Sequence, residues 1–215
     1  MQGKILKDEI ERAIAWYSGW GALVDGAAID MTVRQHMSAA FQHLCLEHHV
    51  ALIHLVQADI YGAAFALYRP QFDAFTRGAW VRACAPDDWI EGFRSGDKQP
   101  PNLKDLISDL ERVEGYGDGF LSSFRDTAYG LLCDFTHGGA VQIQARVASG
   151  AIKQRWAEEH IAGLLRSSSA LTYLACIEIA HLADDKTLAN EFAVRHQRAY
   201  PASLIRNIPI EAVGG

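Results

Sequence analysis

Two segments of the chain place charged side chains inside strongly apolar stretches, and these side chains are the best placed to bind a ligand. In the first segment, Arg69, Asp73 and Arg77 follow one another at intervals of four residues. This spacing stacks the three side chains on one face of a helix. A carboxylate between two guanidiniums can be buried only when all three charges are paired, because an unpaired buried ion is strongly disfavoured. The segment therefore predicts a polar cluster in which Arg69 and Arg77 hold an anion.

The second segment brings a carboxylate and an imidazole to the end of a helix. Asp134 and His137 are three residues apart, and Gly138-Gly139 follows as a helix stop. We expect both side chains to join the arginine cluster, where His137 would orient the bound anion without turnover. The predicted ligand-binding residues are Arg69, Asp73, Arg77, Asp134 and His137.

Metal binding is the alternative that the histidines raise. His43 and Glu47 share one helix face. Asp134 with His137, and Glu178 with His181, each place a carboxylate and an imidazole one turn apart on other helices. Di-metal bundles use such acid and imidazole pairs together with carboxylates from further helices. Asp73 would be one of these carboxylates, but the arginines on either side of it would repel a divalent cation. We therefore expect no cofactor, keep a divalent metal as the alternative, and expect the histidines to bond each other and nearby acids inside the bundle.

Helices are expected to position all of these residues, because apolar residues recur with a period near 3.6 and alternation is scarce. The expected helices cover residues 3–16, 30–57, 62–84, 102–113, 120–135, 153–183 and 185–198, with a further helix starting after Pro86. Thr32 or Asp30, Asn102, and Asp184 or Asp185 are the expected N-caps. Residues 18–28 are expected to form a connection, and residues 141–151 an extended arm or a helical turn.

Pro70 falls inside the expected helix over residues 62–84. Proline lacks a backbone N–H and its ring clashes with the preceding turn, so it predicts a kink or the start of the main helical body. No repeat, low-complexity run or linker divides the chain. We therefore expect one all-α domain built on a bundle of four or five long helices, with residues 1–30 as N-terminal helix and connection, 31–199 as the bundle and 200–215 as a tail.

Composition narrows the cellular setting. The 215 residues carry a net charge of −6, so nothing attracts nucleic acid to the chain as a whole. The four cysteines are widely spaced and fit reduced thiols in a cytosolic protein better than a disulfide framework. The N-terminus mixes acids and bases where a signal peptide would be apolar, and no later run is long enough to span a bilayer. We expect a cytoplasmic protein without a membrane partner.

The order of these features resembles an uncharacterised bacterial branch of the HEPN-like helical families. The resemblance covers residues 47–139 and is carried by Arg69-Pro70 through Asp73 to Trp80, and by His137-Gly138-Gly139. It implies a HEPN-like bundle that forms a homodimer, has an RNA or protein partner, and belongs to RNA metabolism, toxin–antitoxin pairs or phage defence.

Active HEPN ribonucleases carry an Arg followed shortly by a His near the end of a core helix, and here His137 occupies the matching place. The position that the Arg should fill is Leu132, and Arg125 lies too far upstream. A leucine cannot bind phosphate or stabilise charge that builds on it. The resemblance therefore favours a non-catalytic member, with a divergent ribonuclease as a further alternative. Arg155 and His160 match the literal spacing, but they stand early in an expected helix and fit a solvated helix face better.

Overall fold

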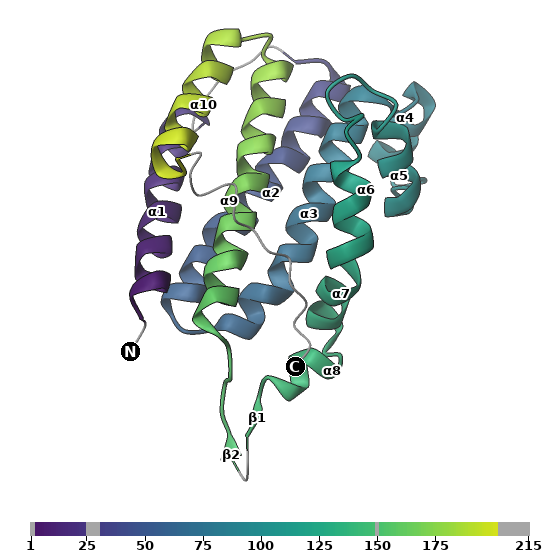
Figure 1. The fold of residues 1–215 in the computed structure, drawn as a ribbon. Coiled ribbons are helices and arrows are strands. Elements are labelled where there is room, and N and C mark those ends of the chain that lie inside the picture. The colour runs from purple at the N-terminus through teal and green to yellow at the C-terminus, as the bar shows by residue number, and fades with distance from the viewer. Residues whose placement is uncertain (1–2, 25–30, 149–150, 202–215) are drawn as a thin grey trace.

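Long helices run side by side through the bundle (Figure 1) in the computed structural model, which describes residues 3–24, 31–148 and 151–201. They are α1 (Lys4–Val24), α2 (Val33–Gln57), α3 (Tyr61–Ala83), α9 (Glu158–Leu182) and the shorter α10 (Lys186–Ala199). The remaining elements are α4 (Asp87–Ser95), α5 (Leu103–Leu110), α6 (Phe120–Phe124), the π-helix η1 (Arg125–Tyr129), α7 (Gly130–His137), α8 (Ala140–Gln144), β1 (Val147–Ala148) and β2 (Ala151–Ile152). The all-α prediction is confirmed, apart from the β1–β2 hairpin.

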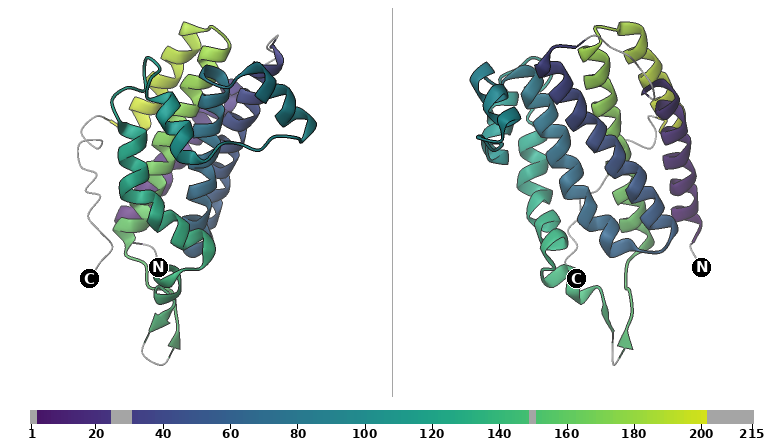
Figure 2. Two further views of the ribbon diagram at one scale, coloured as in Figure 1. Left: turned by 90° about the vertical axis from the view of Figure 1, so that its right-hand side faces the viewer. Right: turned by 180° about the vertical axis from the view of Figure 1, so that it is seen from behind.

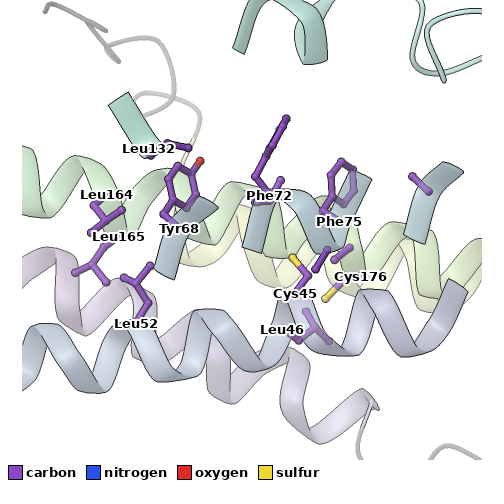
Figure 3. Close-up of a cluster of buried hydrophobic side chains, with 14 of the residues drawn as sticks. Cys45, Leu46, Leu52, Tyr68, Phe72, Phe75, Leu132, Leu164, Leu165 and Cys176 are labelled. Atoms are coloured by element: carbon purple, nitrogen blue, oxygen red, sulfur yellow. The ribbon is translucent and has the colours of Figure 1, made fainter. Parts of the chain in front are cut away.

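Helix α3 lies at the centre of the arrangement and contacts α2, α5, α7 and α9. Its aromatic side chains Phe72 and Phe75 are fully buried, and Figure 3 shows them beside Cys45 of α2 and Cys176 of α9. Burying one such side chain contributes about 1.5–3 kcal/mol. Arg69 and Asp73 of α3 contact η1 and α7, whereas Arg82 pairs with Glu178 of α9.

Local capping signals fix several helix starts where the sequence placed them. Thr32 forms a capping box with Gln35 at the start of α2. The side chain of Asn102 caps α5, and that of Asp185 caps α10. At the other end of α7, Gly138 adopts a left-handed φ of 68°, which few residues other than glycine adopt readily.

The first helix is longer than the sequence indicates. The prediction ended it at Trp16 and began a connection at Ser18, whereas α1 continues to Val24. Two contacts favour the extra turns: Trp20 is buried against the core, and Arg195 of α10 donates to the carbonyl oxygen of Gly19 at 2.9 Å. Residues 25–30 of the predicted connection lie outside the described residues, as does the predicted tail beyond Pro201.

The start of the long C-terminal helix is also corrected. The sequence suggested a start near Lys153, but α9 begins at Glu158, because Arg155 instead donates its backbone N–H to Ala145 in the hairpin ladder at 2.8 Å. Two acids, Glu158 and Glu159, then occupy the first turn of α9, where they complement the helix dipole. The segment predicted as an arm or a helical turn contains both, since α8 precedes the hairpin.

None of the helices within the described ranges combines the length and hydropathy that a bilayer span requires.

Candidate functional site

Pro70 leaves a backbone acceptor of α3 open on the side that faces α7. Helix α3 is continuous through Pro70, which has no N–H to offer the carbonyl of Ala66 four residues earlier. The hydroxyl of Thr136 lies 3.2 Å from this carbonyl oxygen and 2.8 Å from that of Leu132, and it can donate to either. A polar side chain of α7 thus reaches the acceptor that proline left open, and its neighbour His137 is brought to the surface of α3.

The π-helix η1 brings an unexpected side chain to the same place. Five residues, Arg125–Tyr129, form this π-helical segment within the stretch predicted as one α-helix. Such segments are rare and are frequent at functional sites. The hydroxyl of Tyr129 accepts a hydrogen bond from Arg69 Nε at 3.0 Å and donates to Asp73 Oδ1 at 3.1 Å. Tyr129 therefore bridges the cation and the anion of α3.

Arg69 makes its second contact with His137. The guanidinium Nη1 lies 2.5 Å from the imidazole Nε2. Arginine has donors only, so Nε2 must accept, and the proton of the neutral ring is then on Nδ1. This contact, together with Tyr129, fixes the plane of the guanidinium.

The cluster carries more positive than negative charge. The Arg69 and Asp73 side chains are 22% and 15% exposed, and Arg69 Nε lies 3.9 Å from Asp73 Oδ2. Burial raises the pKa of Asp73, while Arg77, the Tyr129 hydroxyl and Arg69 act to lower it. Two guanidiniums therefore stand beside a single carboxylate that is itself poorly solvated.

Donors remain free in this cluster. Within the described part of the chain, Arg69 Nη2 has no hydrogen-bond partner, and half-buried Arg77 makes no hydrogen bond or ion pair. These nitrogens are not among the buried atoms without a partner, so they reach solvent and can donate to an added acceptor without first breaking a bond within the protein. We call Arg69, Asp73, Arg77, Tyr129 and His137 the α3–α7 cluster.

Asp134 makes its contacts elsewhere. Its carboxylate accepts from the backbone N–H of Gln142 at 3.1 Å and so caps α8. It also packs so closely on Gly139 that a Cβ there would collide with it. The structure therefore brings Arg69, Asp73 and His137 together as the sequence suggested, whereas Asp134 shapes the turn after α7.

The model of a family of unknown function, DUF6988, matches residues 42–206. The chain belongs to this family. No curated protein and no solved structure matches the chain. The DUF6988 match covers every residue of the α3–α7 cluster and all of α8 and the hairpin, while α1 lies before it.

The structure does not bring the proposed metal ligands of this DUF6988 protein together. His43 and Glu47 are exposed on α2. Glu178 is buried, and its carboxylate accepts hydrogen bonds from the guanidinium of Arg82 at 2.5 and 2.9 Å and from the hydroxyl of Tyr116 at 2.8 Å. His181 lies on the exposed side of this pair. Across residues 3–24, 31–148 and 151–201, no three His, Cys, Asp or Glu side chains are placed to hold a metal ion.

The two residues that match the ribonuclease spacing, Arg155 and His160, do not lie on one helix in this DUF6988 protein. Arg155 lies in the link between β2 and α9, where its backbone N–H donates to Ala145, and His160 lies in the first turn of α9. Both residues are exposed, and they do not share a helix as the sequence suggested.

Tyr129 and Thr136 are the members of this region that sequence reasoning missed. The sequence did not indicate Tyr129. An α-helical period over residues 120–135 assigns the wrong helix face to side chains that follow a π turn. Thr136 did leave one, since a proline inside a helix predicts an orphan carbonyl that some neighbouring donor must satisfy.

Proposed function

We propose that this DUF6988 protein binds a phosphate-bearing ligand, without turning it over, at the α3–α7 cluster. The observation that carries the proposal is the set of free donors on Arg69 and Arg77 beside a single carboxylate. The planar guanidinium matches a phosphate oxygen pair in two parallel bonds. Tyr129 and His137 hold Arg69 in one orientation, which lowers the entropy lost when a ligand binds.

Leu132 supports a binding role over catalysis, because it stands where an active HEPN ribonuclease would carry its arginine. The HEPN-like resemblance adds that the protein is a cytoplasmic bacterial homodimer with an RNA or protein partner in RNA metabolism, toxin–antitoxin pairs or phage defence. This addition rests on the sequence resemblance.

A divergent ribonuclease is the second candidate, and one contact favours it. Arg69 reaches His137 from a different helix, so an arginine and a histidine meet in space although the linear motif has Leu132. RNA cleavage requires a group that moves a proton and a group that stabilises the phosphorane, and an imidazole and a guanidinium can fill these two roles.

Calorimetric titration with inorganic phosphate tests the binding role. We expect wild-type protein to bind phosphate and Arg77→Gln to bind about tenfold more weakly, since a hydrogen bond to a charged group contributes about 1.5–3 kcal/mol. Arg94→Gln is the control, because Arg94 is a surface residue outside the cluster. Equal phosphate affinity in Arg77→Gln and wild type would contradict the proposal.

Incubation with single-stranded RNA separates the second candidate from the first. Cleavage that disappears in His137→Ala and persists in His160→Ala supports the ribonuclease. Cleavage that is absent from wild-type protein, or unchanged in both variants, removes it and leaves the binding role.

A further inference from the structure

The hairpin and its flanks form an arm that projects beyond one end of the bundle (Figures 1 and 2). We call residues 140–148 and 151–157 the arm. Three of its apolar side chains are exposed to unusual degrees: Ile143 by 52%, Val147 by 63% and Ile152 by 97%. Val147 pairs directly with Ile152, and directly opposed side chains in an antiparallel pair lie on the same face. The arm therefore presents a small apolar face that nothing within the described residues covers.

The arm is firmly attached to the core. Lys153 donates its N–H to Arg146 at 3.0 Å, which continues the ladder below the β1–β2 pair. Next to it, Trp156 stacks on Phe65 of α3 with ring centroids 4.7 Å apart and an angle of 22°. A preformed surface of this kind loses little entropy when it docks.

The charge of the arm is opposite to that of another region of the chain. The sequence from residue 140 to residue 157 contains three bases, Arg146, Lys153 and Arg155, and no acid. Residues 103–120, which cover α5 and the loop into α6, contain five acids and two bases. Figure 1 shows them on the right-hand side of the upper bundle, away from the arm at its lower end. We call residues 103–120 the acidic end. Beside its acids, Phe120 is 49% exposed and offers an apolar surface.

We infer that the arm of one copy of this chain packs on the acidic end of a second copy. Opposite charges steer and align the two surfaces, while the apolar side chains of the arm meet Phe120. Pairing of two arms is disfavoured, because it would bring their bases together. Two copies that lie antiparallel can make the contact twice, which closes a symmetric dimer. The inference does not depend on the α3–α7 cluster.

Sedimentation velocity over a wide protein concentration range tests the contact. Wild-type protein is expected to dimerise, and added salt to weaken the dimer by screening. Lys153→Glu/Arg155→Glu is expected to raise the dimer dissociation constant about a hundredfold, since juxtaposed like charges are strongly unfavourable. Lys4→Glu/Lys7→Glu changes the net charge equally on exposed positions of α1 and serves as the control.

A charge exchange makes the test specific for the acidic end. Glu114→Lys/Asp118→Lys alone should also weaken the dimer, and combining it with the arm reversal in one chain should restore dimerisation. Ile152→Ser should weaken the dimer without lowering monomer stability, because Ile152 is solvent-exposed. A monomeric wild type, or an exchanged variant that stays monomeric while circular dichroism shows it folded, would overturn the inference.

Discussion

The hydroxyl of Thr136 lies 3.2 Å from the carbonyl oxygen of Ala66, the acceptor that Pro70 leaves without a helical donor. One proline in α3 thus prepares a docking point on α7, and the next residue of α7, His137, meets Arg69. The α3–α7 cluster is built around a local defect of the central helix.

Thr136→Val tests this docking point, since valine keeps the shape and removes the donor. We expect the free energy of unfolding to fall by about 1 kcal/mol, the usual net contribution of such a bond. Phosphate affinity should fall as well, because His137 loses its support. Thr127→Val is the control. The hydroxyl of Thr127 donates only to carbonyl oxygens of the preceding helical turn, so phosphate affinity should stay at the wild-type value. Equal affinity in all three proteins would contradict the docking role.

The Arg69 contact predicts the tautomer of His137. At a pH where the ring is neutral, its proton should lie on Nδ1, because Nε2 accepts from Arg69. Nitrogen-15 NMR of the imidazole distinguishes the two tautomers directly. In Arg69→Gln the preference for Nδ1–H should weaken, and a wild-type ring protonated on Nε2 would show that the contact does not form in solution.

The ion pair between half-buried Arg82 and buried Glu178 predicts strong coupling. Arg82→Met should lower the free energy of unfolding by about 3 kcal/mol, because it leaves a buried carboxylate without its cation. Arg82→Met/Glu178→Gln should be more stable than Arg82→Met alone, since no charge then remains buried. Urea unfolding of the single and double variants measures this coupling, and additive effects would contradict it.

His196 predicts a loss of stability in mild acid. The imidazole is stacked between Tyr173 and Tyr200, and burial lowers its pKa from 6.5 to about 4. As pH falls from 6.5 towards 4, the His196 imidazole becomes protonated in the unfolded chain but stays neutral in the folded protein. The free energy of unfolding should therefore fall by up to about 1.4 kcal/mol per pH unit from this group.

His196→Phe should reduce that slope, because phenylalanine can occupy the stack without titrating. Buried His49, whose pKa burial lowers to about 3, keeps part of the pH dependence in the variant. Denaturant unfolding between pH 6.5 and 4 compares the variant with wild type, and an unchanged slope in His196→Phe would contradict the assignment.

Sequence signals succeeded where the cause is local. The caps at Thr32, Asn102 and Asp185 act within one turn, so they predicted helix starts correctly. The spacing of Arg69 and Asp73 likewise placed both on one face of α3. Features set by distant contacts were missed: Trp20 extends α1 by packing, and the hairpin ladder delays α9 to Glu158.

The site shows the same division. Asp134 had the right type and spacing for the cluster, but the backbone N–H of Gln142 competes for its carboxylate. The π turn directs Tyr129 towards α3, and no residue pattern in this chain predicts such a turn. The sequence predicted which polar side chains form contacts between helices. It did not predict which residue each of them contacts, because that depends on how the helices dock.

The stacking of Trp156 on Phe65 makes the hairpin a continuation of the hydrophobic interior. Phe65 stands one turn from Arg69 on the same helix. The packing that anchors the base of the hairpin on α3 therefore lies within one helical turn of an arginine of the α3–α7 cluster.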